Sequence, residues 1–421
     1  MTKIFAVVAF VTTIAVGNLS PLVASAAADT CTWTGATSAN WNDGTNWSGC
    51  DNGGVPENGD TLVFPAGASN LTNNNDIAGL TPDHLVISGT GYSLGGNALT
   101  NTTSGNFIQA TESATINLQI AFNGANTGAS ATSGKTLTFA QPQAFGSAFG
   151  QYWTGGGTII FNGNLTGSTG GMFRAENSTT VQVNGATNTF TSTRVGAESN
   201  ATFACNSTTC FGDNANTIYM GGGTVALQVS NTFTNNFQTS LTTVDVSRLT
   251  ANDNVSITGT NSTVNDDLRI DQLTAGKSLQ FTGTATLNGN LEVYGNNTTS
   301  DIKFDGGLTG AGGVTVQSGN AWMSAPHTFD GIVTVKSGAV AKADQIDSLG
   351  SSLGATVVES GGSLVLESGA GDVTSAEPLQ IAGSGVASTA YAGAIYGVGT
   401  NDFTLTGTVA LTDDATVYSS S

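Results

Sequence analysis

A short strand motif that returns along the chain constrains the fold more than any other feature of the sequence. VTVQSG begins at Val314 and returns as VTVKSG at Val333, an offset of 19 (333 − 314). A repeat of this length is the signature of a solenoid, in which each unit packs only against its neighbours. Inward side chains of one coil then stack on those of the next, and the Ser-Gly pair lets the chain turn where a Cβ would clash.

Two looser copies of the motif indicate how the coils are arranged. TVVESG begins at Thr356, an offset of 23 from Val333 (356 − 333), and LVLESG begins at Leu364, a further offset of 8 (364 − 356). The longer offset predicts equivalent strands one full coil apart, whereas the shorter offset predicts strands on successive faces of one coil. The apolar motif positions are the expected core of this region: Val314, Val316, Val333, Val335, Leu364 and Leu366.

The part of the chain that precedes this motif consists of short runs of residues typical of β-strands. Between residues 66 and 300 there is no helical periodicity, and short runs of β-branched and apolar residues are each followed within a few residues by Gly, Asn or Ser. Such runs alternate inward apolar with outward polar side chains. We therefore predict an all-β fold, a parallel β-solenoid over residues 66–421 whose repeats continue beyond the chain end, with outward ladders of Thr, Asn and Ser. The clearest runs are Thr158–Phe161, Thr179–Val183, Thr224–Val229 and Ser278–Phe281.

Few residues are charged, and most of those are acidic. Of 421 residues 9% are charged, with 10 Lys or Arg against 29 Asp or Glu, for a formal net charge of −19. A basic surface able to displace counterions from a phosphate backbone is missing, so we expect no nucleic-acid partner. The acidic residues are scattered along the sequence, which predicts that like charges do not stack between coils.

The N-terminus has the pattern of an export signal over residues 1–26. Lys3 gives a positive start, residues 4–16 are apolar, and Ala24–Ala26 is a small-residue cleavage site. An uncleaved membrane anchor is the alternative, but Gly17 and Pro21 interrupt the helix that an anchor needs. No later segment is apolar over the length of a membrane helix, so we expect a secreted protein whose contact with a membrane depends on an anchor outside this chain.

The four cysteines form an even set, which an oxidising compartment allows to pair. Cys31 and Cys50 lie on either side of a segment rich in Trp and Asn, and Cys205 and Cys210 are close enough in sequence to close a local loop. Zinc is the competing interpretation, but the spacing is not that of two C-x2-C pairs and only two histidines are available to assist. The disulfide candidates are Cys31, Cys50, Cys205 and Cys210.

Residues 27–65 form a separate N-terminal segment in which Trp alternates with Asn and Gly. It contains Trp33, Trp41 and Trp47, three of the five Trp residues of the chain. Large aromatic side chains at the end of a stacked structure cover an apolar layer that would otherwise face water, and we expect these to form such a cap. The alternative is a carbohydrate-binding face, since indole rings with polar neighbours suit sugars.

These motifs resemble a known family. Between Gly306 and Leu366 the chain carries GLTGAGGV from Gly307, HTFDG from His327, the VTV and SG elements from Val333, and SLG at 348–350. This stretch resembles the autotransporter-associated β-strand repeat of bacterial surface passengers, and the Trp-rich start is similar to the module that often precedes such repeats. The resemblance implies a right-handed parallel β-helix, secreted and displayed at a bacterial surface, commonly for adhesion. The family's C-terminal barrel has no counterpart in these residues.

An enzyme on the same fold is the alternative function, because β-helices also carry polysaccharide lyases and hydrolases. The best local candidate is NDDLRID, in which Asp267, Arg269 and Asp271 share one face of a strand and place a cation between two carboxylates. The same spacing is typical of a solvent-facing stripe of ion pairs, which is the interpretation we prefer. We therefore expect no catalytic residues.

The remaining titratable residues give no clear site. Asp413 and Asp414 form an acidic pair without a basic neighbour in sequence, and His84 and His327 are isolated. Asp372 lies in a Gly-rich stretch that resembles one unit of a calcium-binding nonapeptide repeat, but that motif works in tandem. No cofactor is predicted; Ca²⁺ is compatible with so acidic a chain, without a specific site.

Taken together, the residues predict a secreted or surface-displayed β-solenoid with a structural and adhesive role. Its expected partners are host-cell, matrix or glycan surfaces, met by the outward polar ladders. An uncovered last coil also exposes strand edges, so end-to-end self-association is expected.

Overall fold

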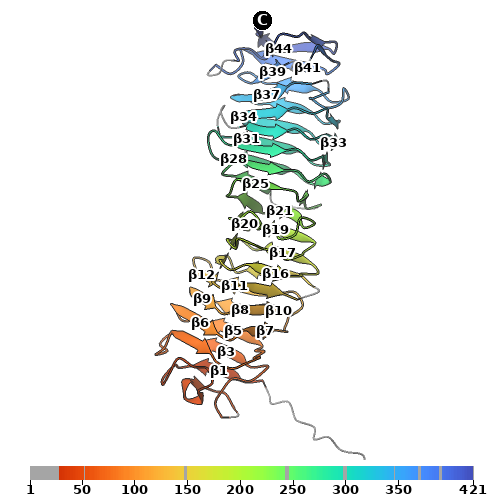
Figure 1. Cartoon of the computed structure of the whole chain (residues 1–421). Helices are drawn as coiled ribbons and strands as arrows, with labels where there is room; N and C mark the ends of the chain where they lie inside the picture. Colours follow the sequence, from red (N-terminus) through yellow and green to blue (C-terminus); the bar gives the residue numbers. More distant parts are fainter. Residues whose placement is uncertain are drawn as a thin grey trace, which may run out of the picture.

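Stacked coils build an elongated rod, with the first coils at one end and the C-terminus at the other (Figure 1). The computed structural model describes residues 28–51, 53–146, 149–241, 246–296, 301–345, 347–367, 371–387 and 391–420. The export signal predicted for residues 1–26 lies outside these residues. The rod is a β-solenoid of about 15 turns with about half of its residues in strands, which confirms the predicted all-β solenoid. No helix in the described residues is long and apolar enough to span a membrane.

Each coil places strands on up to three parallel sheets, which we call faces 1, 2 and 3. Face 1 begins in the Trp-rich segment. There the short 3-10 helix η1 (Gly44–Asn46) leads into β2 (Trp47–Ser48), which pairs antiparallel with β1. Its parallel strands are β1 (Thr30–Trp33), β3 (Thr61–Phe64), β5 (His84–Ile87), β8 (Gly105–Ala110), β11 (Thr127–Ala131), β14 (Gln151–Thr154), β17 (Met172–Ala175), β19 (Arg194–Glu198), β21 (Thr217–Gly221), β24 (Phe237–Thr239), β27 (Ser262–Val264), β30 (Ala285–Leu287), β33 (Leu308–Gly310) and β35 (Thr328–Phe329). In the last coils β40 (Val373–Ser375) and β43 (Phe403–Leu405) follow in the same place along the chain.

Face 2 extends from the second coil to the last. Its strands are β4 (Thr72–Asn75), β6 (Tyr92–Gly96), β9 (Ala114–Asn117), β12 (Thr136–Phe139), β15 (Thr158–Phe161), β18 (Thr180–Val183), β20 (Thr202–Cys205), β22 (Thr224–Leu227), β25 (Ser247–Ala251), β28 (Leu268–Gln272), β31 (Leu291–Gly295), the first half of β34 (Val314–Met323), β36 (Val333–Val335), β38 (Thr356–Val358), β41 (Leu379–Gly383) and β44 (Val409–Ala415).

Face 3 is made of two separate sheets. The first holds β7 (Leu99–Asn101), β10 (Ile120–Phe122), β13 (Gln143–Phe145) and β16 (Leu165–Gly167). The second holds β23 (Asn231–Phe233), β26 (Val255–Ile257), β29 (Ser278–Phe281), β32 (Asp301–Phe304), the second half of β34, β37 (Ala339–Ala343), β39 (Ser363–Glu367), β42 (Ile395–Val398) and β45 (Val417–Ser420).

The register confirms the arrangement that the repeated motif predicts. Val314 pairs with Val333, and Val333 with Thr356, so these copies lie one coil apart on face 2. Leu364 lies on face 3, as the short offset predicts. The coil that begins at Val314 is nevertheless short, because its offset is 19 (333 − 314), whereas the coil that begins at Thr158 reaches its register partner at an offset of 22 (180 − 158). It is short because β34 crosses from face 2 to face 3 without a loop.

The glycines of the motif act as the sequence predicts. Gly338 and Gly361 have φ angles of 80° and 86°, in the left-handed region that favours glycine. A Cβ on Gly361 would lie 2.5 Å from the Ser337 hydroxyl of the preceding coil. Glycine is therefore required here both by the turn and by the close approach of the next coil.

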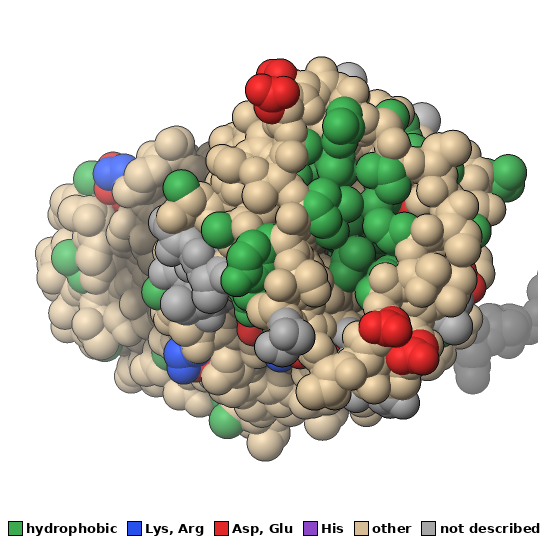
Figure 2. Space-filling model, turned by 90° about the horizontal axis from the view of Figure 1, so that it is seen from above, with side chains coloured by type: hydrophobic (Ala, Val, Ile, Leu, Met, Phe, Trp, Pro, Cys, Tyr) green, Lys and Arg blue, Asp and Glu red, His purple; other side chains and the backbone are tan. Residues whose placement is uncertain are grey.

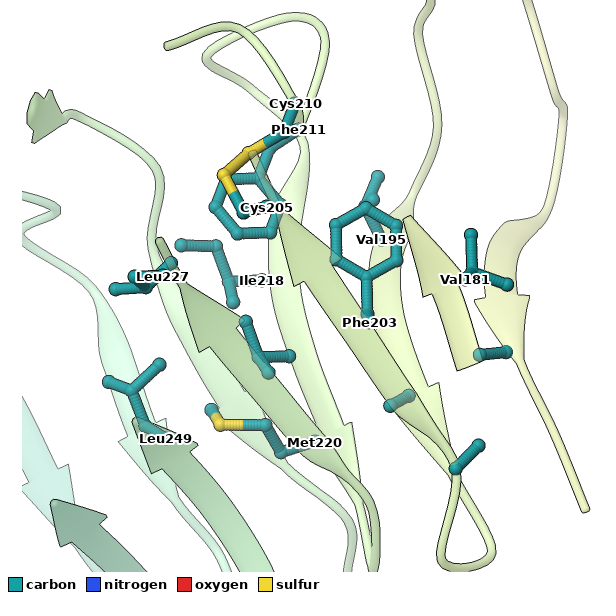
Figure 3. Packing of buried hydrophobic residues seen from close by; sticks show 14 of the residues in the cluster. Val181, Val195, Phe203, Cys205, Cys210, Phe211, Ile218, Met220, Leu227 and Leu249 are labelled. Atoms are coloured by element: carbon teal, nitrogen blue, oxygen red, sulfur yellow. A yellow bond between two sulfur atoms is a disulfide. The ribbon is translucent and has the colours of Figure 1, made fainter. Parts of the chain in front are cut away.

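Inward side chains of all faces meet in one continuous core. Strands such as β15 and β18 alternate half-buried and buried residues, and every predicted core position, from Val314 to Leu366, is at most 4% exposed. Phe203 stacks on Phe211 with ring centroids 5.6 Å apart, next to aliphatic residues of the adjacent strands (Figure 3). Full burial of a side chain of this size stabilises a fold by about 1.5–3 kcal/mol, so the stacked core holds the rod together.

Candidate functional site

The three Trp residues of the N-terminal segment lie inside the first coils. Trp33 and Trp41 are fully buried and Trp47 is 6% exposed, and all three rings lie within 6.5 Å of the ring of Phe64. Their indole N–H groups donate to Asn70 O, Asn73 Oδ1 and Trp41 O at 2.7–2.9 Å. Because the ring faces are buried and the N–H groups are already hydrogen-bonded, these rings are not placed to stack on a sugar or to donate to its hydroxyls. Their placement favours the predicted cap over the carbohydrate-binding alternative.

Two disulfides form between the four cysteines. Cys31 pairs with Cys50 beside the Trp rings, and Cys205 pairs with Cys210 across a short loop next to β20. The second bond is visible against Phe203 and Phe211 (Figure 3). Both pairings are those that the spacing suggests, and they leave no thiolate for the zinc alternative. Within the described residues no group of His, Cys, Asp or Glu is arranged to hold a metal ion.

The predicted acidic and basic stripe exists, but without Asp267. Arg269 and Asp271 point outward from β28 and form an ion pair at 2.7 Å, and Arg248 of the previous coil contacts the second oxygen of Asp271 at 2.8 Å. Asp267 precedes the strand and accepts a hydrogen bond from the N–H of Asn290. Asp271 is 2% exposed with both oxygens engaged, so it is poorly placed to reach a polysaccharide.

A second ionic cluster lies on face 1, and sequence reasoning missed it. Arg174 pairs with Glu176 at 2.5 Å and with Glu198 of the next coil, and its guanidinium lies 4.9 Å from the ring centre of Tyr152. Arg194 covers the ring of Tyr219 in the same way. The offset of 22 between Glu176 and Glu198 (198 − 176) is the signal that could have revealed the cluster.

The prediction that acidic residues avoid stacking is wrong on face 1 and at one corner of face 3. On face 1, Glu176 and Glu198 follow two residues that are register partners. Ala343 pairs with Leu366, so Asp344 and Glu367, the residues that follow them, lie one above the other. Burial, together with the negative charges of Glu367 and Asp305, raises the pKa of Asp344 above its usual value. The offset between Asp344 and Glu367 is 23 (367 − 344), equal to that between the motif copies at Val333 and Thr356 (356 − 333), so the repeat carried the signal of this alignment.

The remaining candidates of the sequence are dispersed. His84 contacts Asp83 at 2.8 Å at the outside of the rod. His327 is fully buried, its Nδ1 accepts the N–H of Leu308 at 3.1 Å, and burial lowers its pKa to about 4. It bridges two coils as a neutral ring. Asp372 accepts the N–H of Asp402. Asp413 and Asp414 are exposed on the last coil.

Rows of outward hydroxyl groups run along two faces of the rod. The face-2 threonine row occupies one register position in five successive coils, and the face-1 threonine row does so in four. Neighbouring coils in a sheet are about 4.8 Å apart, so each row repeats at that spacing. The face-2 row is Thr136, Thr158, Thr180, Thr202 and Thr224; the face-1 row is Thr263, Thr286, Thr309 and Thr328.

An amide ladder runs along the corner that follows face 2. Asn206 donates to Asn184 and Asn184 donates to Asn162, each from side-chain Nδ2 to side-chain Oδ1 at 2.8 Å. Gln141 donates to Asn117 in the same way at 3.0 Å. The outward Thr and Asn ladders that the sequence predicts are thus present, and their amides are fixed in one orientation by the coil below.

Two open depressions lie among these polar side chains. One of about 320 Å³ lies on face 2 and one of about 280 Å³ on face 3. Neither has the closed apolar wall that is typical of a small-molecule pocket. The first is lined by Thr90, Gly91, Tyr92, Ser93, Ser113, Ala114, Thr115, Thr136 and Thr138; the second by Ser230, Asn231, Thr232, Asn254, Val255, Ser256, Ser278 and Gln280.

Comparison with known proteins adds no relative. No protein-family model matches the chain, and neither a curated protein nor a solved structure matches it.

Proposed function

We propose that this chain is an exported bacterial surface protein of the autotransporter-associated repeat type, a rod that attaches to glycan, matrix or host-cell surfaces through its outward hydroxyl and amide ladders. The observation that carries the proposal is the register of the two threonine rows, which present hydroxyl groups at a constant spacing along the rod. Two disulfides support an oxidising location outside the cytoplasm.

Attachment through these ladders would depend on many weak hydrogen bonds of the same kind. A single exposed hydroxyl gains little by exchanging water for a polar surface, since the net contribution of one hydrogen bond is about 0.5–1.5 kcal/mol. A rigid row engages several groups at once, and the later contacts form at high effective concentration. An extended polymer or surface suits this geometry better than a small ligand, because the depressions are open and polar.

Retention on a glycan array and on polysaccharide-coated plates tests the proposal. A variant with T158V, T180V, T202V, T286V, T309V and T328V removes hydroxyls from both rows while keeping β-branched side chains of similar shape. We expect at least a tenfold loss of retention. The matched control changes the same six residues to Ser, which keeps the hydroxyls, and should retain binding.

Two outcomes contradict the proposal. Unchanged retention of the folded Val variant, with a wild-type circular dichroism spectrum, excludes the rows as the contact surface. Release of soluble products from a polysaccharide by the purified chain, abolished by R269A, indicates the enzymatic alternative instead.

A further inference from the structure

The outer surface of face 2 is uncharged from β6 to β22. The outward side chains of these successive coils form three columns, each of which follows the register from strand to strand. None of the three columns contains an Asp, Glu, Lys or Arg residue, and we call this surface the neutral stretch. The first column is Gly91, Ser113, Thr136, Thr158, Thr180, Thr202 and Thr224; the second is Ser93, Thr115, Thr138, Ile160, Gln182, Ala204 and Ala226; the third is Gly95, Asn117, Ala140, Asn162, Asn184, Asn206 and Gln228.

Charged residues on face 2 begin directly after the neutral stretch. Arg248 and Arg269 continue the first column beyond β22. Beside the first column Lys135 and Glu112 pair with each other at 2.7 Å, so their charges cancel. Seen from the C-terminal end of the rod, charged side chains are also few (Figure 2). A ligand that lies over the three columns therefore meets no ionic group.

The larger of the two open depressions lies at the start of the neutral stretch. It has a volume of about 320 Å³, and its lining includes the hydroxyl groups of Thr90, Ser113 and Thr138 but no charged side chain. Gly91 and Ser93 leave this space open, because the coil of β6 carries no bulky side chain on its outer surface. From here the columns continue to β22, so the surface suits an extended chain better than an isolated small molecule.

The polar groups of the neutral stretch keep hydrogen-bonding capacity for a ligand. Asn184 donates to Asn162 and accepts from Asn206, which uses one of the two N–H groups and one of the two lone pairs of its amide oxygen. A threonine hydroxyl offers one donor and two acceptor lone pairs. The hydroxyl groups of a neutral sugar also both donate and accept, so the two surfaces complement one another without an ionic contact.

An acidic glycan does not suit this surface. A carboxylate or sulfate group on the three columns would lose its water without gaining a cationic partner. The chain as a whole also has a formal net charge of −19, which repels polyanions over a distance of about 8 Å at physiological ionic strength. Neither effect acts on a neutral polymer.

We propose that the neutral stretch of face 2 binds uncharged polysaccharides, with the polymer lying along the rod across successive coils. The inference rests on the proposed attachment role and adds the class of ligand and the part of the rod that contacts it. Equivalent groups repeat at about 4.8 Å along each column, so a regular polymer contacts several coils at once. Because no ionic contact contributes, binding should not depend on salt.

Retention on plates coated with different polysaccharides tests the proposal. The neutral coatings are a β-glucan, a mannan and a galactan, and the acidic coatings are polygalacturonate and a sulfated galactan. At least one neutral polymer should retain the wild-type chain at least tenfold better than either acidic polymer does. This retention should be equal in about 0.05 M and about 0.5 M NaCl, between which the Debye length changes severalfold.

Variants that add charge locate the contact. Q182E/N184D introduces two carboxylates of nearly unchanged shape on the neutral stretch and should weaken retention by the neutral polymer at least fivefold. The matched control Q238E/N288D makes the same two changes on and beside face 1 and should bind as the wild type does. Because N184D also breaks the amide ladder, T138E in another coil is a second charged variant, and T138S should retain binding. All variants should keep the wild-type circular dichroism spectrum.

Several outcomes overturn the proposal. They are equal retention by acidic and neutral polymers, retention by neutral polymers that falls with salt, unchanged retention of folded Q182E/N184D and T138E, and no retention by any neutral polymer. In each case, capture of the wild-type chain by another glycan, matrix or host-cell surface, lost in the six-residue Thr-to-Val variant, would still support the attachment role. Failure of the ligand assignment is thus distinguishable from failure of the proposed function.

Discussion

Glu377 places a carboxyl group inside the rod. Its side chain is 4% exposed, and its Oε1 accepts a hydrogen bond from the Thr356 hydroxyl at 2.9 Å. Burial raises the pKa of Glu377 from 4.5 to about 7. The unfolded chain therefore loses this proton at a lower pH than the folded one. The contribution of Glu377 to stability is full below pH 4.5 and is lost as the pH rises through 7.

Replacement of Glu377 by Gln should separate these two regimes. Gln keeps the acceptor for Thr356 and never ionises, so we expect E377Q to raise the thermal midpoint by a few degrees at pH 8 and to leave it unchanged at pH 4. Thermal unfolding followed by circular dichroism at pH 4, 6 and 8 measures the difference. A gain of the same size at all three values would show that the carboxyl group does not titrate in this range.

At the scale of elements, the first disulfide holds the Trp cap on β1. Cys31 lies in β1 and Cys50 follows β2, and the bond closes a loop with a sequence separation of 19. A disulfide that closes a loop of this length lowers the entropy of the unfolded chain and so stabilises the fold by about 3 kcal/mol. Its loss should let η1 and β2 separate from the first coil and expose the buried indole rings.

The paired variant C31S/C50S should therefore shift tryptophan emission to longer wavelength and lower the thermal midpoint. The matched control is C205S/C210S, which opens a loop with a separation of only 5 far from the cap. The control should leave tryptophan emission unchanged. Equal spectra for both variants would mean that the cap is held by packing alone.

Much of this element structure could be predicted from the sequence. Val314 and Val333 carry the same motif, and identical motifs occupy equivalent places in a solenoid, so their stacking followed directly. Contacts between Arg174 and Glu198 were missed, because corner loops set the length of each coil and only the offset of 22 between Glu176 and Glu198 (198 − 176) marks this one, with no repeated motif beside it. The stacking of Asp344 and Glu367 could have been predicted, because their offset of 23 (367 − 344) is the offset between the motif copies at Val333 and Thr356 (356 − 333).

Over the whole molecule, the two ends differ in how well their coils are held. The N-terminal coil has a disulfide and a buried aromatic cap, whereas Val409 and Leu411 of the last coil are exposed. In solenoids each unit is stabilised mainly by its neighbours, and poorly packed elements open first. In a sample of the 421-residue chain alone, the C-terminal coil should therefore open more readily than the rest of the rod.

Hydrogen exchange in dilute solution, followed by mass spectrometry, should show this gradient. We expect the fastest exchange of strand amides in β43 to β45, and slow exchange in central strands such as β15 and β18, which have partners on both edges. Uniform protection along the rod, or faster exchange in β1 and β3, would contradict the expected difference between the ends.

Coil length and coil spacing are independent in this molecule. The offset from Val314 to its partner Val333 is 19 (333 − 314), and the offset from Leu379 to its partner Val409 is 30 (409 − 379), yet both pairs meet in register. Hydrogen bonds between strands fix the axial rise at about 4.8 Å per coil, while extra residues are accommodated at the corners. Insertions and deletions at the corners therefore change the outline of the rod without changing the spacing between its coils. The corner loops can diverge in sequence and length while the distance between equivalent side chains along the rod stays constant.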